Sequence, residues 1–196
     1  MTFLFGRRRN LPARTLRTAI FAALSIFICL EQCAAQDDAQ AVEHQVKAAF
    51  LYKFAGYVKW PDSADARPDA PFTIGVIGAD AIAAELVEAV AGRKLEDRNI
   101  AVKRLKAGEP LAGIQILFVG RSEAARLNQL LQAAQPRSIL VVTESEGALA
   151  QGSVINFVMA DRRVRFEISL DSAEKSRLKL SSRLLAVAQQ VRTGTP

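Results

Sequence analysis

The pattern of apolar and polar residues changes its period several times along the chain. From Ala41 to Trp60 the apolar side chains recur every three or four residues, which predicts an amphipathic helix. This helix ends at Trp60 because the residue before Pro61 avoids the helical conformation. Four later segments are short apolar runs or alternate in polarity, and they predict strands: Phe72–Ile77, Asn99–Leu105, Ile114–Val119 and Ile139–Thr143.

Helical segments separate these strands. Asp80 is the expected N-cap of an alanine-rich helix, and Gly92 lies just beyond the end of that helix. Ser122 opens a second helix, which runs to about Ala134 because Pro136 prevents its extension. Strands that alternate with helices are typical of an α/β domain.

The C-terminal third departs from this alternation. Val154–Met159 and Val164–Leu170 read as two strands joined around Asp161, which predicts an antiparallel hairpin. A closing helix is expected over Ser182–Val191, and Asp171 begins a pattern that resembles a capping box. We therefore predict one α/β domain over residues 36–196, with a mixed β-sheet, helices on both faces, and a C-terminal β-hairpin followed by a helix.

Residues 1–35 have the three parts of a secretory signal peptide. The basic stretch Arg7–Arg17 precedes the apolar run Ala19–Leu30, which is shorter than the roughly 20 residues that a bilayer-spanning helix needs. Small residues at Cys33–Ala35 fit cleavage after Ala35. We expect a cleaved signal and export to the periplasm, with an uncleaved N-terminal anchor as the alternative.

The leader also explains the charge of the chain. The net charge is +6, but the leader holds five arginines and one acidic residue, so residues 36–196 carry only +2. A nearly balanced domain gives no electrostatic reason to expect nucleic acid as a partner. Both cysteines, Cys29 and Cys33, lie in the leader, so the mature domain has no disulfide, thiol nucleophile or thiolate ligand.

Familiar enzyme motifs are absent from the sequence. His44, the only histidine, lacks the neighbours that a metal or catalytic site needs and reads as an ordinary, partly exposed helix residue. Gly75 and Gly78 form only part of a nucleotide-binding fingerprint, and Asp80 would repel a phosphate there. The pair Glu144 and Glu146 lies in a polar stretch and is expected to be solvated. We predict no catalytic residue, no metal site, no cofactor and no enzymatic activity.

Two features are candidates for a binding surface. Five aromatic residues crowd the end of the first predicted helix, so that Tyr52 or Trp60 could lie exposed, although simple core packing explains the cluster as well: Phe50, Tyr52, Phe54, Tyr57 and Trp60. In the predicted hairpin, strand alternation places Glu167 on the face opposite Phe166 and Ile168. Such a face could dock a partner or simply be solvated.

Several of these segments together resemble the YfiR family of periplasmic regulators. The stretches that carry the resemblance are AAFLYKFAGYVKWP (Ala48–Pro61), TIGVIGAD (Thr73–Asp80), IQILFV (Ile114–Val119), GSVINFV (Gly152–Val158), RVRFEIS (Arg163–Ser169) and RLKLSSRLLAVA (Arg177–Ala188). They span nearly all of residues 41–191, and the first and the last two are distinctive as a set.

The resemblance implies a small periplasmic α/β regulator without enzymatic activity. It implies binding to the periplasmic portion of an inner-membrane diguanylate cyclase, which lowers cyclic di-GMP and biofilm formation. It further implies a homodimer and an outer-membrane lipoprotein that assists release. One departure stands out, because the family's namesake carries disulfides in its mature domain, whereas this mature chain has no cysteine and Asn156 stands where one is expected.

The hairpin pattern and the resemblance together suggest where a partner binds. We expect the contact at the hairpin face and the turn that follows it, through Ile155, Phe157, Glu167 and Ala173. The alternative function is a periplasmic small-molecule sensor or solute-binding module, with a pocket at the strand ends near Gly78–Asp80.

Overall fold

The computed structural model describes residues 38–61, 70–106 and 108–194. The chain divides into two units, Met1–Ala41 and Val42–Pro196, and the β-sheet belongs entirely to the second. The predicted signal peptide, residues 1–35, lies outside the described residues. Within the described ranges, no helix combines the length and the apolarity needed to cross a bilayer.

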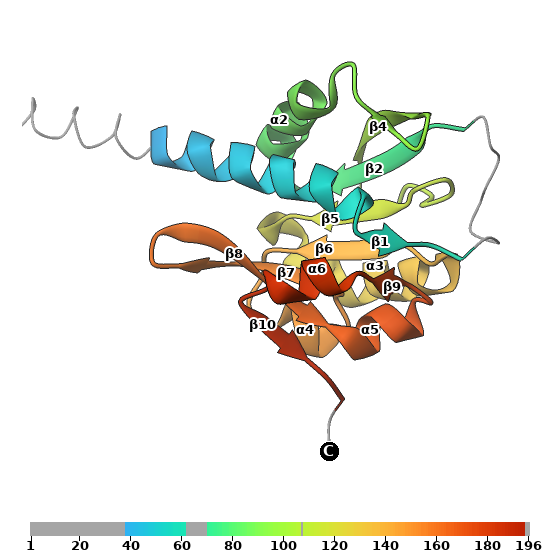
Figure 1. The fold of residues 1–196 in the computed structure, drawn as a ribbon, viewed down its shortest axis with the longest axis vertical. Coiled ribbons are helices and arrows are strands. Elements are labelled where there is room, and N and C mark those ends of the chain that lie inside the picture. The colour runs from blue at the N-terminus through green and yellow to red at the C-terminus, as the bar shows by residue number, and fades with distance from the viewer. Residues whose placement is uncertain (1–37, 62–69, 107, 195–196) are drawn as a thin grey trace, which may run out of the picture. The chain divides into compact units, whose positions relative to one another are not determined.

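A mixed sheet forms the centre of the second unit (Figure 1). Eight strands of the described residues are ordered β10–β8–β7–β6–β5–β2–β4–β3, and neighbours run parallel except β7 with β8 and β3 with β4. Their bounds are β2 (Phe72–Ile77), β3 (Lys94–Leu95), β4 (Arg98–Leu105), β5 (Ile116–Val119), β6 (Leu140–Thr143), β7 (Ile155–Ala160), β8 (Arg163–Ser169) and β10 (Gln190–Arg192). Separately, β1 (Val58–Lys59) pairs antiparallel with β9 (Lys179–Leu180).

The strand order reverses direction once, at the centre of the sheet. From β2 the chain moves outward to β4, and it then returns to build β5, β6 and β7 on the other side of β2. Because parallel crossovers are right-handed, such a reversal places the connecting helices on opposite faces. The carboxyl ends of β2 and β5 flank the point of reversal, which is where open α/β sheets usually bind ligands.

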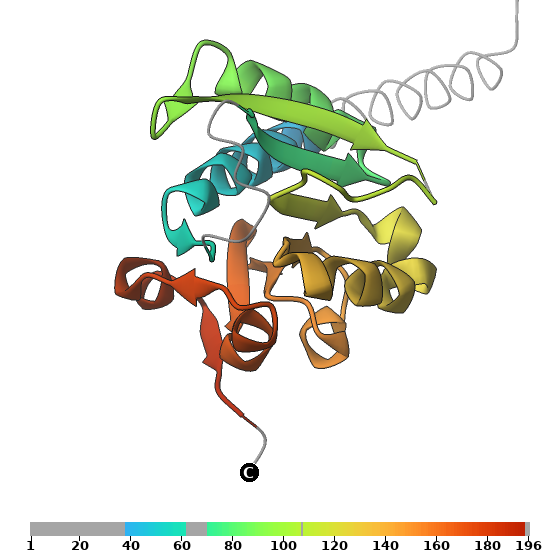
Figure 2. The ribbon, with the colours of Figure 1, turned by 90° about the vertical axis from the view of Figure 1, so that its right-hand side faces the viewer.

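Helices cover both faces of the sheet (Figure 2), as the sequence predicts. The first helix (residues 38–55) and α2 (Asp80–Val90) pack on one face, whereas α3 (Leu127–Ala134) and α4 (Ala148–Gln151) pack on the other. Shorter helical segments complete the chain: η1 (Arg121–Arg126), η2 (Gln135–Arg137), α5 (Leu170–Lys175) and α6 (Ser182–Ala186).

Alternate residues of the central strands divide between two apolar clusters. On β5, for example, Phe118 belongs to the cluster under the first helix, while Leu117 and Val119 belong to the cluster under α3. This explains why the strands read as continuous apolar runs, since both sides of each strand are buried.

The hairpin is confirmed, and its turn has the expected chemistry. β7 and β8 pair antiparallel from Ile155 opposite Ile168 to Ala160 opposite Arg163. The two turn residues, Asp161 and Arg162, have φ angles of 49° and 59°. Positive φ at both positions is what a tight two-residue turn needs to match the twist of its strands.

The closing segment differs from the prediction. The helix expected over Ser182–Val191 ends at Ala186, and Gln190–Arg192 instead forms β10 beside β8. Val187, which lies on the predicted apolar stripe, is 62% exposed, whereas Val191 pairs with Ile168. Residues 190–192 therefore pair with the edge of β8 and do not continue the helix. This pairing gives hydrogen-bond partners to backbone groups at the edge of β8 that would otherwise lack them.

Three predicted helix caps also differ. Ser122 lies inside η1, which begins at Arg121, and its hydroxyl donates a hydrogen bond to the Gly78 carbonyl instead of capping a helix. Asp80 is the first residue of α2 rather than its N-cap, and there its carboxylate still complements the helix dipole. The N-cap of α5 is Ser169, whose hydroxyl accepts a hydrogen bond from the Ser172 amide at 3.2 Å, so Asp171 lies inside the first turn.

Candidate functional site

The four residues predicted to contact a partner do not share one surface. Ile155, Phe157 and Ala173 are 0%, 3% and 2% exposed and belong to the apolar core, whereas Glu167 is half-buried. Strand pairing explains the difference, because Phe157 lies opposite Phe166 on the core side and Glu167 points to the other side. Of these four residues, only Glu167 is therefore able to contact a partner protein directly in this conformation.

The core side of the hairpin rests on the first helix through aromatic rings. Phe54 lies 5.9 Å from Phe157 and 5.1 Å from Phe166, measured between ring centroids, and Phe50 approaches Phe166 to 5.4 Å. These separations suit favourable edge-to-face and offset packing. The aromatic-rich helix end thus serves mainly as core, and it supports the hairpin from beneath.

The remaining aromatic residues of that cluster are less buried. Tyr57 is 39% exposed, while Tyr52 and Trp60 are half-buried. The Arg93 guanidinium lies 5.1 Å from the Tyr52 ring centroid, and Trp60 packs edge-on against Phe72. The sequence singled out Tyr52 or Trp60 as exposed, but Tyr57 is the more exposed side chain.

The opposite side of the hairpin carries charged residues, and we call it the outer hairpin face: Val158, Ala160, Arg163, Arg165 and Glu167. Arg163 and Arg165 are exposed, and none of the three charged side chains forms an ion pair with a described residue. β6 pairs only with Ile155 and Asn156 of β7, and β10 pairs only with Glu167–Ser169 of β8. The outer half of the hairpin therefore extends beyond its neighbours (Figure 1).

Asn156 occupies a buried polar cluster at the base of the hairpin. It is 4% exposed, and its Oδ1 accepts a hydrogen bond from Thr143 Oγ1 at 2.8 Å. Thr143 Oγ1 also lies 2.9 Å from Ser153 Oγ. The position where a cysteine was expected is thus held by hydrogen bonds between β6 and β7.

The point of strand reversal is closed by direct backbone packing. The Gly120 amide donates to the Ile77 carbonyl at 2.9 Å, and the Ser122 hydroxyl donates to the Gly78 carbonyl at 2.9 Å. A Cβ atom on Gly120 would lie only 2.2 Å from the Gly78 oxygen. The loop that follows β5 therefore packs directly on Gly78, and a pocket of about 400 Å³ lies beside it, lined among others by Ile77, Leu111 and Glu123.

A buried ion cluster lies at the same edge of the sheet. Lys47 of the first helix, whose side chain is 3% exposed, pairs with Glu43 and with Glu144, which follows β6. The Glu144 carboxylate also accepts the Arg121 amide at 3.2 Å. The Glu144 side chain is only 10% exposed, so the expectation that it is solvated is wrong, whereas Glu146 is exposed. His44, one residue beyond Glu43, is half-buried.

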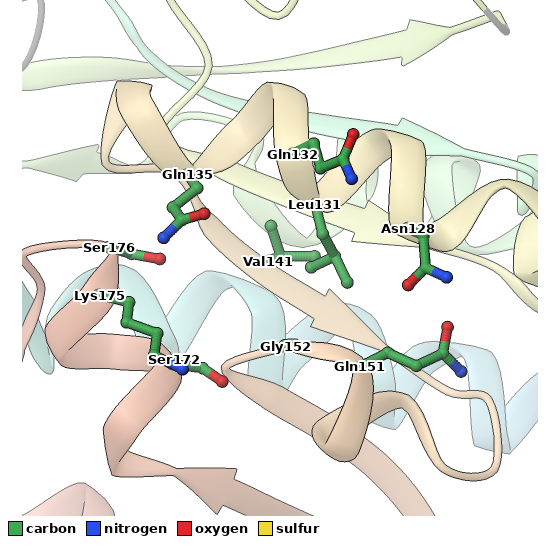
Figure 3. Close-up of a pocket in the computed structure, with 10 residues that line it drawn as sticks. All are labelled: Asn128, Leu131, Gln132, Gln135, Val141, Gln151, Gly152, Ser172, Lys175 and Ser176. Atoms are coloured by element: carbon green, nitrogen blue, oxygen red, sulfur yellow. The ribbon is translucent and has the colours of Figure 1, made fainter.

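A polar pocket opens on the α3 side of the sheet, between α3, α4 and α5 (Figure 3). Its volume is about 420 Å³, and Val141 of β6 lies at its base. Asn128 and Gln151 lie at one end of the opening, and Gln135 and Lys175 lie toward the other (Figure 3). The sequence analysis missed this site because its residues come from three helices that no motif connects.

Across the part of the chain that the structure describes, no three His, Cys, Asp or Glu side chains gather as a metal site requires. The charged side chains described above lie in three other places. They form the ion cluster around Lys47, they lie on the outer hairpin face, or, in the case of Lys175, they line the polar pocket.

Comparison with known proteins identifies a family for this chain. A family model described as YfiR/HmsC-like matches residues 44–189. None of the curated proteins matches significantly. A conserved domain protein from Vibrio cholerae O1 biovar El Tor strain N16961 is 12% identical with a TM-score of 0.46, and the match covers 61% of this chain and 54% of that one. An ABC domain from Streptococcus pneumoniae, solved in complex with L-Trp, is 11% identical with a TM-score of 0.47, and the match covers 62% and 55%. The chain thus spans little more than half of these two structures.

Proposed function

Because this chain belongs to the YfiR/HmsC-like family of periplasmic regulators of cyclic di-GMP signalling, we propose that it represses an inner-membrane diguanylate cyclase. It would do so by binding the periplasmic portion of that cyclase, thereby lowering cyclic di-GMP and biofilm formation. The observation that carries this proposal is the extent of the family match, which covers residues 44–189 and so includes every strand of the central sheet except β10. Regulation of this kind needs a binding surface and no catalytic group of its own.

Export forms part of the proposal. Residues 1–35 would direct the chain to the periplasm and be cleaved near Ala35, which leaves residues 36–196 as the regulatory domain. The homodimer and the outer-membrane lipoprotein remain predictions that follow from the resemblance alone.

We assign the cyclase contact to the outer hairpin face. Glu167, Arg163 and Arg165 are accessible charges without an ion partner among the described residues, on a strand pair that extends beyond its neighbours. The aromatic packing beneath Phe157 and Phe166 holds this face rigid, which reduces the ordering that binding requires. Ile155, Phe157 and Ala173 would then support the contact from inside the core rather than touch the partner.

The function is tested by the cyclic di-GMP level in matched strains. The strains are wild type, a deletion, and the deletion complemented either with the full chain or with a chain lacking residues 1–35. Deletion should raise cyclic di-GMP, and only the full chain should restore the normal level. An unchanged level in a deletion of a demonstrably expressed gene would contradict the link to a cyclase.

The contact surface is tested by charge reversal at Glu167. Glu167→Lys should raise cyclic di-GMP toward the deletion level and weaken binding to the cyclase's periplasmic portion about tenfold, because it reverses the one negative charge of the outer hairpin face, which a bound partner would have to complement. Glu85→Lys on α2 is the matched control, since Glu85 is also a half-buried glutamate without an ion partner among the described residues. Full repression by Glu167→Lys at an equal periplasmic level would show that the assigned surface is wrong.

A further inference from the structure

The polar pocket between α3, α4 and α5 collects hydrogen-bonding groups that the protein itself does not use. Four carboxamide side chains line it, and none of them forms a hydrogen bond with a described residue: Asn128, Gln132, Gln135 and Gln151. All four are exposed to solvent, so water satisfies them in the free protein. A pocket whose carboxamide groups are all still available can bind a ligand through them without breaking internal hydrogen bonds.

The pocket holds one charged group. Lys175 of α5 is exposed and pairs with no carboxylate of the described residues, and no acidic side chain lines the pocket. Asp171, one turn earlier on α5, accepts a hydrogen bond from the Gly194 amide at 2.8 Å instead. The Lys175 ammonium is therefore free to pair with one anionic group of a ligand.

The base of the pocket is formed by buried serine side chains, one of which is held by a hydrogen bond. Ser172 and Ser176 of α5 are 7% and 6% exposed, and the Ser172 hydroxyl is fixed by Ser169 Oγ at 2.9 Å. Figure 3 shows the Lys175 side chain extending toward Ser172. Leu131 and Val141 supply only a small apolar area between these polar groups.

Together these groups define the chemistry of a ligand. A carboxamide both donates and accepts hydrogen bonds, and so does a hydroxyl group. Several carboxamides in one pocket therefore complement a ligand that carries several neighbouring hydroxyl groups. The single ammonium, that of Lys175, can pair with one carboxylate of the same ligand. The volume of about 420 Å³ lies within the range of ordinary small-molecule sites. We propose that this pocket binds a small polyhydroxylated monocarboxylic acid, of the class of the sugar acids.

The α5 helix connects this site to the rest of the molecule. Ser172, Lys175 and Ser176 face the pocket, while Ala173 of the same helix packs in the core cluster that contains Phe157 and Phe166. Binding itself does not depend on the proposed cyclase repression, because it is measured on the purified protein.

The test compares three probes with protein purified after expression of the full chain. D-Glucuronate carries both hydroxyls and a carboxylate, D-glucose lacks the carboxylate, and acetate lacks the hydroxyls. Calorimetric titration should show glucuronate binding at least about tenfold tighter than either of the others. An absence of glucuronate binding at millimolar concentration would overturn the proposal.

Three variants locate the binding. Lys175→Met should weaken glucuronate binding about tenfold and leave glucose binding unchanged, since it removes only the ammonium. Gln151→Leu should weaken the binding of both sugars. Lys94→Met is the control, because Lys94 is an exposed lysine on β3 outside the pocket, and it should bind like the native protein. Glucuronate binding that is unaffected by both pocket variants would overturn the assignment.

Discussion

Lys47 is a cation that the fold withdraws almost completely from water. Its side chain is 3% exposed and lies between the carboxylates of Glu43, one turn earlier on the same helix, and Glu144 at the end of β6. Burying an unpaired ammonium costs free energy, so the Lys47 ammonium can be buried only because the two carboxylates compensate its charge. The same pair fixes the first helix at the carboxyl edge of the sheet.

Replacing Lys47 should therefore destabilise the protein strongly. Lys47→Met leaves the Glu144 carboxylate buried without its cation, and we expect a loss of about 3 kcal/mol in the free energy of unfolding. Urea denaturation measures the change. Adding Glu144→Gln should restore part of the stability, because it removes the uncompensated charge.

Lys103→Met is the matched control for this prediction. Lys103 pairs with Glu109 at 3.9 Å, and both side chains are well exposed, at 47% and 37%. Exposed pairs contribute little, so its loss should stay within about 0.5 kcal/mol. Equal effects of Lys47→Met and Lys103→Met would show that the Lys47 cluster is solvated in solution.

Single residues also show where sequence reasoning stops. Alternation along β8 correctly separated Glu167 from Phe166 and Ile168, because the period of a strand is a local property. The side on which Ile155 and Phe157 lie depends on the register of β7 against β8 and on what covers the pair. The burial of Glu144 depends on Lys47, which is 97 positions away in the chain, and no local pattern reports such a contact.

At the scale of elements, the C-terminal segment has the residue spacing of a helix, but its last residues pair as a strand. Leu184, Leu185, Val187, Ala188 and Val191 have helical spacing, yet the helix stops at Ala186 and the chain turns to pair with β8. The Gln189 amide donates to the Phe166 carbonyl at 2.8 Å and so begins this pairing. Helix periodicity could not reveal β10, because the available edge of β8 exists only after the sheet has formed.

Removing that amide tests the role of β10. Gln189→Pro deletes the donor to Phe166, and we expect a loss of about 1–2 kcal/mol in unfolding free energy together with faster amide exchange along β8. Gln189→Ala keeps the backbone amide and changes only an exposed side chain, so it should behave like the native protein. If the proline and alanine variants are equally stable, β10 does not hold the edge of the sheet.

At the scale of the whole molecule, the sequence predicted the α/β class, the helices on both faces and the hairpin. These features follow from periodicity and from the buried character of the strands, which are properties of whole segments. The closed strand-reversal point and the polar pocket could not be predicted in the same way. The first depends on the approach of Gly120 to Gly78, and the second on three helices that meet only in the folded chain.

A last prediction concerns what stabilises the fold if residues 1–35 direct export to an oxidising compartment, as proposed. Residues 36–196 contain no cysteine, so the protein that remains after the proposed cleavage would derive its stability from its two apolar clusters and its buried polar contacts. Excess dithiothreitol should therefore leave the midpoint of urea unfolding unchanged, and a Cys29→Ser, Cys33→Ser double variant should yield the same mature protein. A midpoint that falls with reductant only in the chain with both cysteines would show that they persist after export. Cleavage near Ala35 would then be wrong, and thiol chemistry would return as a means of regulation.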